Sequence, residues 1–435
     1  MATIMKNGKS YILGINVSHD RSVCLLENGI IKYAIAEERL DRIKYSTISP
    51  NGETLPRLGI DYVLSNGGVE LDDLDLVILD RAYFNKNIHY NAMLKIPIRQ
   101  KNKIRVLPMP SHHLCHAYSS FYCSPFKESV IFVVDVNGSY TNFLDKCIET
   151  ESAWLYSNNR LETIHKSVRE PGEMSVSYLY MLITNVLGFT GGQRLFNVFR
   201  QLGLEEGGKT MGLEPYGKRR ESFPDFDKYY LNNQNIPHEE IYDFLLKNSL
   251  TYSRSIPYLK TRLTEDIDWR LSFRREGEEI TQLHKDLAYF AQENLEKRMV
   301  PLASNLYDKT KCKNLCLAGG IFLNSVLNKK ILDETPFENI FIQPAATDDG
   351  NSIGCAMYGY HQLLKQGNKK RFVMNMPYFG ASYAYNEIVE VIKNIKNIFK
   401  NVNLLNEDIC KTKDVLKKIA EKISSGKIIG FFKGR

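Results

Sequence analysis

A β-meander occurs twice in the sequence, and this duplication restricts the possible folds more than any other pattern. In residues 11–36 an apolar run ends at Asn16, a polar tip follows, and a second run leads through a turn at Asn28-Gly29 into a third. A similar pattern returns at residues 129–169, where the run VIFVVD ends at Asp135 and alternating segments follow. Apolar runs of strand length joined by Asn-Gly turns are typical of antiparallel meanders. The copies share a pattern and not a sequence, and in each the first strand ends in a polar residue.

Two turns from a strand into a helix follow in the second half of the chain. NLCLAGG (314–320) is a buried strand that ends in paired glycines, and FIQPAATDDGNSIGCAMYGY (341–360) again gives strand, polar turn and helix. Such turns bring backbone amides and carboxylates to one sheet edge, where a nucleotide can bind. Two meanders followed by helices are typical of the duplicated actin-like, sugar-kinase-like α/β fold. We predict this fold for residues 1–368.

The pattern changes at residues 367–376, a basic and polar connector. Apolar residues then recur at helical spacing between Ile388 and Ile395 and between Val415 and Ile423, and the apolar run KIIGFF reads as a strand. We therefore predict a second domain over residues 377–435. A domain of roughly sixty residues that ends after a strand would leave an unpaired edge. We expect a further segment, in the same or a separate chain, to complete it.

Composition excludes several classes of protein. The 435 residues contain no apolar run of membrane-spanning length and no apolar stretch after the basic N-terminal residues, so we expect a cytoplasmic protein with no membrane partner. The eight cysteines lack a CxxC pair, which favours reduced thiols. The net charge is +7, but basic and acidic residues are interleaved, so nucleic acid is an unexpected partner. The basic patch 369–371 is interpreted as a solvated linker.

The strongest chemical signal is the segment SHHLCHAYSSFYCSPF (111–126). His112 and His116 are four residues apart and share a face if the segment is helical, whereas His113 points about 100° away. Two imidazoles on one face suit Fe, Mn or Zn, and carboxylates from elsewhere normally complete the shell. Asp135 at a strand tip and Asp348 in the turn ATDDG are the candidates. A pair of hydrogen-bonded core histidines explains an isolated HxxxH equally well.

His19-Asp20 lies on the loop after the first strand. There an imidazole beside a carboxylate could act as a general base or orient a hydroxyl group. The same dipeptide is also common in ordinary turns.

Two glycine-rich segments are candidates for nucleotide contacts. LEEGGKTMGLEPYGK is not a P-loop, but its Lys209 could neutralise a phosphate; a solvated loop is the alternative. Gly319 and Gly320, followed by Asn324, would allow close backbone approach before a helix N-terminus. Tight packing explains a glycine pair equally well.

Taken in order, these segments resemble the O-carbamoyltransferase family, which includes the nodulation-factor, cephamycin and aminoglycoside carbamoyltransferases. The resemblance covers essentially the whole chain and rests on ILGINVSHD with EER after it, HHLCHAYSSFYCSPF, EEGGKTMGLEPYGK, LAGGIFLNSVLN, QPAATDDGNSIG and GKIIGFFKGR. It implies an N-terminal transferase domain similar to the tRNA threonylcarbamoyl transferase fold, followed by the start of an α/β adenylate-forming domain. It also implies that ATP and carbamoyl phosphate yield a carbamoyl-adenylate, which is attacked by a hydroxyl of a small-molecule or sugar acceptor.

The resemblance also implies roles for individual residues. The metal, implied to be iron(II), would be held by His112, His116, Asp135 and Asp348. The catalytic residues would be His19, as acceptor-side base or positioner, and Lys209. The ATP pocket would be lined by Gly207, Lys209, Gly319, Gly320 and Asn324. Mg²⁺ would accompany ATP at the adenylate-forming domain.

In two respects this sequence departs from the family pattern. Where the family usually has DGxGE, residues 135–139 read Asp-Val-Asn-Gly-Ser, so that Ser139 replaces an acid. After a GKIIGFFKGR-like strand the family continues into a segment rich in Gly, Pro and Arg that builds the adenylate-forming site. We therefore expect the 435 residues to bind a nucleotide without making carbamoyl-adenylate on their own.

Two other functions are compatible with the same residues. A threonylcarbamoyl transferase acting on tRNA shares the fold and the HxxxH pair, and steep salt dependence of tRNA binding would identify it. A catalytically silent binding protein with this fold is the other, and metal analysis would separate it from an enzyme.

Overall fold

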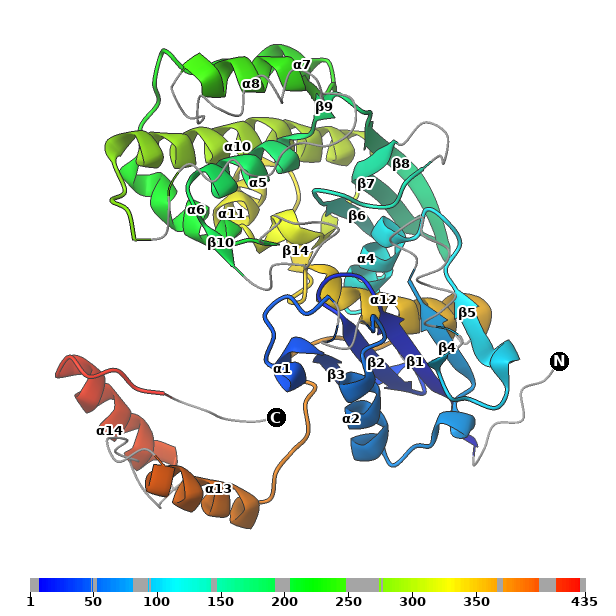
Figure 1. Cartoon of the computed structure of the whole chain (residues 1–435). Coiled ribbons are helices and arrows are strands. Elements are labelled where there is room, and N and C mark those ends of the chain that lie inside the picture. The colour runs from blue at the N-terminus through cyan, green and yellow to red at the C-terminus, as the bar shows by residue number, and fades with distance from the viewer. Residues whose placement is uncertain are drawn as a thin grey trace. The chain divides into compact units, whose positions relative to one another are not determined.

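The computed structural model shows two compact units, Met1–Pro377 and Tyr378–Arg435, which are described separately. The residues that the structure describes are 8–47, 49, 53–80, 93, 95–141, 147–191, 204–247, 274, 277–365, 371–398 and 412–430. Figure 1 gives the element labels used below.

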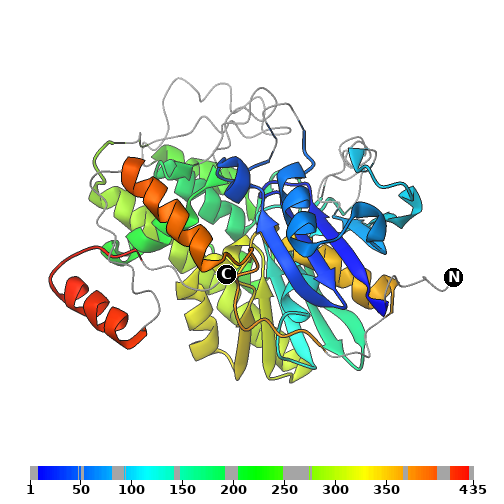
Figure 2. The same cartoon turned by 90° about the horizontal axis from the view of Figure 1, so that it is seen from below.

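The first meander forms one side of a five-stranded sheet in the order β3-β2-β1-β4-β5. Its strands are β1 (Tyr11–Asn16), β2 (Ser22–Glu27), β3 (Ile30–Ala36), β4 (Leu76–Leu79) and β5 (Ile104–Val106). β1 to β3 are antiparallel neighbours, whereas β4 runs parallel to β1 and β5 parallel to β4. Asn28 and Gly29, with φ of 54° and 80°, make the predicted hairpin turn between β2 and β3. The blue arrows of Figure 2 are this meander.

The second meander builds a sheet of the same design, in the order β8-β7-β6-β13-β14. Its strands are β6 (Ser129–Val134), β7 (Ile148–Ser157), β8 (Arg160–Arg169), β13 (Asn314–Ala318) and β14 (Asn339–Ile342). β6 to β8 are antiparallel neighbours, and β13 and β14 continue parallel to β6. Both sheets therefore have the same strand order and the same directions. This repetition confirms the predicted duplicated actin-like fold.

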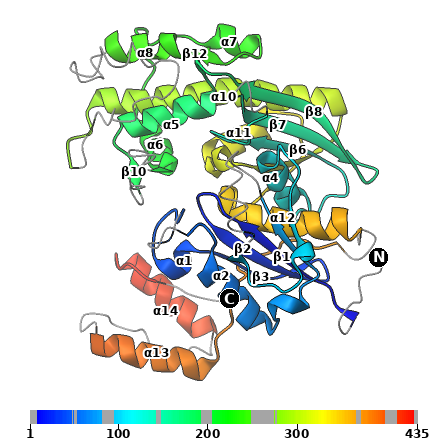
Figure 3. The same cartoon turned by 45° about the vertical axis from the view of Figure 1, so that its right-hand side comes forward.

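Two helices lie between the sheets and join them. α4 (His112–Phe121) packs on β6 and β13 of the second sheet, and α12 (Asn351–Tyr358) packs on β1 and β2 of the first. The two helices also pack on each other, as Figures 1 and 3 show. On the outer faces, α2 (Arg57–Gly67) covers β2 and β3, while α5 (Val176–Val186), α10 (Gln282–Thr310) and α11 (Ser325–Glu334) share the core of the second sheet.

The remaining elements of this unit are short. They are α1 (Glu38–Asp41), η2 (Leu71–Asp73), η3 (Lys101–Lys103), β9 (Glu173–Met174), β10 (Thr190–Gly191), β11 (Leu204–Glu205), α6 (Gly207–Leu213), η4 (Glu214–Tyr216), α7 (Asp227–Leu231), β12 (Ile236–Pro237), α8 (His238–Lys247), η5 (Gly320–Leu323), η6 (Asp348–Gly350) and the π-helical turn η7 (Gly359–Leu363).

Glycine allows α4 and α12 to approach closely. A Cβ atom on Gly354 of α12 would lie 2.0 Å from the carbonyl oxygen of Cys115 on α4. The Sγ atoms of Cys115 and Cys355 lie 3.8 Å apart in this contact, and both side chains are fully buried. Cys115 is therefore a packing residue, as its apolar surroundings favour.

We expect Gly354→Ala to lower the free energy of unfolding by about 1–3 kcal/mol, because the methyl group would push apart two closely packed helices. Urea unfolding followed by circular dichroism measures the change. Gly212→Ala in α6 is the matched control, since a Cβ there meets nothing within 4 Å. That control is expected to be neutral or stabilising by about 0.5–1 kcal/mol. Equal effects of the two substitutions would contradict the close helix contact.

The second unit contains the two predicted helices, α13 (Tyr385–Ile398) and α14 (Thr412–Ser424). Some of the apolar side chains that recur at helical spacing in these two helices are exposed, among them Val391 and Leu416. The predicted strand is not found in its described part, since residues 427–430 have no regular structure. A strand needs a neighbour for its backbone hydrogen bonds. Among the described helices of both units, none combines the length and apolar character that a bilayer crossing requires.

Candidate metal centre and its surroundings

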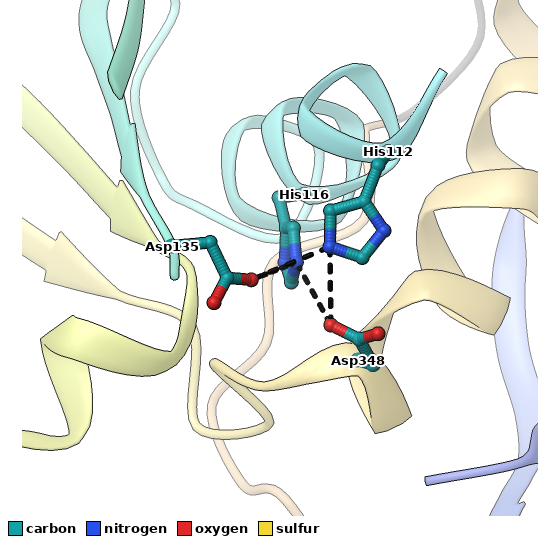
Figure 4. A group of neighbouring side chains, drawn as sticks. All are labelled: His112, His116, Asp135 and Asp348. Atoms are coloured by element: carbon teal, nitrogen blue, oxygen red, sulfur yellow. Dashed lines mark hydrogen bonds and ion pairs between the residues drawn. The ribbon is translucent and has the colours of Figure 1, made fainter. Parts of the chain in front are cut away.

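Four side chains from three segments of the sequence meet beside the contact between α4 and α12. His112 and His116 project from one face of α4, with ring centroids 4.8 Å apart. Asp135 follows the last residue of β6, and Asp348 begins the turn η6 before α12. Figure 4 shows both imidazoles pointing towards the two carboxylates. The structure thus brings together all four residues that the sequence analysis selected as metal ligands.

The spacing of these side chains fits a metal shell. His112 Nε2 lies 3.3 Å from Asp135 Oδ2 and 3.2 Å from Asp348 Oδ1, and His116 Nε2 lies 3.4 Å from each of the same atoms. For metal–ligand bonds of about 2.1 Å, tetrahedral ligand atoms lie about 3.4 Å apart. All four ligand atoms lie within 4.8 Å of one another. The donor set, two imidazole nitrogens and two carboxylate oxygens, suits iron, manganese or zinc.

Hydrogen bonding within the cluster is incomplete, which also fits a metal. His116 Nε2 is buried and has no hydrogen-bond partner among the described residues, although two carboxylate oxygens face it. Buried polar atoms in native proteins nearly always have a partner. Coordination would satisfy the lone pair of this nitrogen.

The cluster also favours positive charge. Burial lowers the pKa of His112, but the carboxylates of Asp348 and Asp135 outweigh it and raise that pKa well above its ordinary value. For Asp348, an acid, burial acts in the opposite direction and raises the pKa. The neighbouring His112, His19 and His116 outweigh burial and hold the pKa of Asp348 well below its usual range. Two ionised carboxylates in a buried site stabilise a cation between them.

His19 stands at the edge of the cluster and contacts the far side of Asp348. Its Nε2 lies 3.3 Å from Asp348 Oδ2, and its Nδ1 lies 3.4 Å from Asp20 Oδ2. Burial lowers the pKa of His19, but Asp348 and Asp20 outweigh it and raise the pKa to about 10. Because both ring nitrogens face carboxylates, the geometry favours a positioning role over that of a free base.

Three further polar residues around the cluster were missed by the sequence analysis. Ser18 Oγ donates to Asp348 Oδ2 at 2.9 Å, and Asn16 Nδ2 donates to the backbone oxygen of Asp348 at 2.8 Å. Asp80 is fully buried at the end of β4, and burial raises its pKa to about 6, although His112 acts to lower it. The run LVILD ends in an acid as VIFVVD does, so the strand-tip rule that selected Asp135 could also have found Asp80.

Two of the predicted nucleotide contacts lie near each other. The hydroxyl of Tyr180 on α5 donates to the backbone oxygen of Gly207 at 3.2 Å and accepts from Asn324 Nδ2 at 3.4 Å. Asn324 is also the N-cap of α11, since its Oδ1 accepts from Leu327 N at 2.9 Å. Lys209 on α6 is more than half exposed and forms an ion pair with Glu206.

The glycine pair lies beside Asp135. Gly319 has φ of 100°, and a Cβ there would lie 2.1 Å from the carbonyl oxygen of Val134. A Cβ on Gly320 would lie 3.4 Å from Asp135 Oδ1. Close packing therefore accounts for Gly319, and the nucleotide role of both glycines stays a prediction.

The solvated-linker interpretation of the basic patch 369–371 is wrong for Arg371, the one of its residues that the structure describes. Arg371 is partly buried, donates to the backbone oxygens of Phe121 and Phe126, and stacks over the Phe121 ring at 4.0 Å. It thereby binds the C-terminal end of α4.

Two surface cavities lie along α10, away from these residues. One, of about 500 Å³, is lined by acidic side chains such as Glu214 and Glu296 together with Lys330. The other, of about 420 Å³, is lined by residues including Arg219 and Phe223. Neither lining includes a residue predicted for the site.

Comparison with known proteins gives one family match. The family model described as "Carbamoyltransferase N-terminus" matches residues 77–357, more than half of the chain. The chain is 28% identical, over 98% of its length, to the uncharacterized protein sll1178 of Synechocystis sp., of which it covers 68%. It is also 28% identical, over 96% of its length, to the nodulation protein NolNO of Sinorhizobium fredii. It spans 56% of that relative.

Among solved structures, HypF of T. kodakarensis aligns with a TM-score of 0.48 and 15% identity. The alignment covers 82% of this chain and 49% of HypF.

Proposed function

The chain belongs to the carbamoyltransferase family, and we propose that it transfers a carbamoyl group to a hydroxyl of a small-molecule or sugar acceptor at the His112, His116, Asp135 and Asp348 site. The observation that supports the site most directly is the convergence of these four side chains on one buried point, with His19 at its edge. The proposal includes iron(II) as the metal and ATP with carbamoyl phosphate as the source of the group. It also includes Mg²⁺ as the companion of ATP.

In the proposed reaction the acceptor oxygen forms a bond to the carbamoyl carbon of a carbamoyl-adenylate. The bond between that carbon and the phosphate oxygen breaks, and AMP leaves with the proton of the hydroxyl. A divalent metal held by the four side chains would supply Lewis acidity towards a carbonyl or phosphoryl oxygen.

The residues of this chain have separate roles in the proposal. His19 is the positioning residue on the acceptor side, where Asp20 and Asp348 fix its ring and where it in turn orients Asp348. Ser18 fixes the Asp348 oxygen that faces away from the two imidazoles. Lys209 neutralises phosphate charge, since it lies in the first turn of the glycine-rich helix α6 and its side chain is more than half exposed.

The nucleotide is proposed to lie along the glycine-rich turns. We assign its contacts to Gly207, Lys209, Gly319, Gly320 and Asn324. Supporting this, Gly320 lies beside Asp135, while Gly207 and Asn324 share the hydroxyl of Tyr180.

The test supplies the iron-loaded protein with synthetic carbamoyl-adenylate, or with ATP, Mg²⁺ and carbamoyl phosphate, and a panel of hydroxylated acceptors. Mass spectrometry is expected to detect carbamoylated product with the synthetic donor. His19→Asn is expected to lower the rate about 10²–10⁴-fold, the usual effect of removing an acid, base or positioning group. Its melting temperature and metal content should match the wild type.

Absence of product from every acceptor with the synthetic donor would contradict the proposed function. Near-normal transfer by His19→Asn would remove His19 from the mechanism. A further reaction contains bulk tRNA in place of the small acceptors. Carbamoylated tRNA in that reaction would instead favour a tRNA substrate.

A further inference from the structure

The first turn of α4 is capped by a residue from outside the helix. The backbone N–H groups of Ser111 and His112 donate to Oγ of Ser139 at 3.1 Å and 3.0 Å. The first N–H groups of a helix have no partner within the helix, so a side-chain oxygen there fixes the start of the helix. Ser139 is fully buried, and it lies on the loop that follows Asp135.

Ser139 is itself held by Glu149 of β7. Glu149 Oε2 accepts from the backbone N–H of Ser139 at 3.1 Å. The backbone N–H of Glu149 donates to the backbone carbonyl oxygen of Ser139 at 3.0 Å. The other carboxylate oxygen accepts from Lys166 Nζ at 2.7 Å. The Glu149 side chain is only 1% exposed, so these partners compensate for its burial.

The loop before Ser139 is packed tightly against the same turn of α4. A Cβ on Gly138 would lie 2.7 Å from Nε2 of His113 and 2.8 Å from Cβ of Glu149. His113 in turn is bound through Nδ1 to Ser152 Oγ at 2.8 Å. The start of α4 therefore has little freedom to shift relative to Asp135, which lies four residues before Ser139.

We propose that Ser139 is a positioning residue for the metal centre and that Glu149 acts through it. The Oγ atom of Ser139 accepts from the backbone N–H of His112 and so fixes its position. The imidazole of His112 faces Asp135 and Asp348. The inference rests on the metal site of the proposed function.

The test measures Co²⁺ binding by anaerobic titration, with the visible absorption of bound Co²⁺ as a report on coordination geometry. Ser139→Ala is expected to weaken Co²⁺ affinity about 10–100-fold, as removal of residues that support metal ligands typically does, and to alter the absorption spectrum. Ser139→Thr keeps the capping oxygen and is expected to restore most of the lost affinity. Thr281→Ala is the matched control, since Thr281 caps α10, a helix without a candidate ligand.

A double-mutant cycle tests the role of Glu149. If Glu149 acts through Ser139, the double variant Ser139→Ala/Glu149→Ala binds Co²⁺ no more weakly than the weaker single variant. Additive losses would show that Glu149 acts by another route.

Two outcomes separate this inference from the proposed metal site. Wild-type protein that binds no Co²⁺ would overturn the metal site and the inference together. Wild-type binding with an unchanged affinity and spectrum in Ser139→Ala would overturn the inference alone. If Ser139→Ala does not fold, Ser139→Cys replaces it, because a thiol of similar size is a weak acceptor and should give the same loss of affinity.

Discussion

The His116→Ala variant is expected to lose its metal ion, from about one iron per chain in the wild type to the background level of a chelator-treated sample. The substitution removes one of the four candidate ligands and leaves only His112, Asp135 and Asp348. Carbamoyl transfer should fall by more than about 100-fold, since loss of residues that merely support metal ligands already costs 10–100-fold. Elemental analysis after anaerobic loading with iron(II) and desalting measures the first effect.

His113→Ala is the matched control for this experiment. His113 lies on the same helix and is equally buried, but its Nδ1 is bound to Ser152, and burial lowers its pKa to about 4. The control should therefore retain its iron. Full iron content in His116→Ala would rule out the four-residue site, and equal loss in both variants would point to disruption of α4.

The parts of the fold that were predictable from sequence are those that depend on local periodicity. Each meander has strand-length apolar runs, and each of the first strands ends in a polar residue, Asn16 or Asp135. These two strands lie in different sheets, but within the second sheet β6, β13 and β14 run parallel, so the segments that follow β6 and β14, with Asp135 and Asp348, leave the sheet at the same edge. The strand-tip rule, together with the four-residue spacing of His112 and His116, makes these residues predictable from the sequence as candidate ligands.

The residues that were missed depend on contacts between distant segments. Ser139 lies four residues after Asp135 in the sequence. Its proposed positioning role depends on hydrogen bonds to the start of α4 and to Glu149, and no local sequence pattern connects these segments. Arg371 follows two lysines and so reads as solvated, whereas in the structure it binds the end of α4. In the described part of the predicted final strand, residues 427–430, no strand is present, because strand formation depends on a neighbour and not on the apolar run alone.

A second large effect is expected at a buried ion cluster that ties α10 to the second sheet. Arg298 of α10 donates from Nε and Nη2 to Glu151 of β7 at 3.0 Å and 2.7 Å, and His165 Nε2 lies 3.2 Å from the same carboxylate. Arg298 and Glu151 are both at most 6% exposed. Removing one partner of such a pair leaves an uncompensated buried charge.

Glu151→Gln is therefore expected to lower the free energy of unfolding by about 3–5 kcal/mol. Urea unfolding followed by circular dichroism measures the loss. Glu162→Gln, an exposed glutamate on the neighbouring strand β8, is the control and should change stability by less than about 0.5 kcal/mol. A loss as small as that of the control would mean that the ion cluster contributes nothing net to stability.

The same carboxylate should make stability depend on acid pH. Burial raises the pKa of Glu151, but the hydrogen bond to His165 and the charge of Arg298 outweigh it and lower the pKa from 4.5 to about 2. Because the folded state holds the proton less tightly than the unfolded chain, the contribution is fully present above about pH 4.5 and is lost as the pH falls towards 2. At 1.36 kcal/mol for each pH unit, the loss is about 3 kcal/mol. Other carboxylates titrate in this range, so the difference between wild type and Glu151→Gln isolates the share of Glu151. That difference should shrink as the pH falls from 5 to 2, and a constant difference would contradict the lowered pKa.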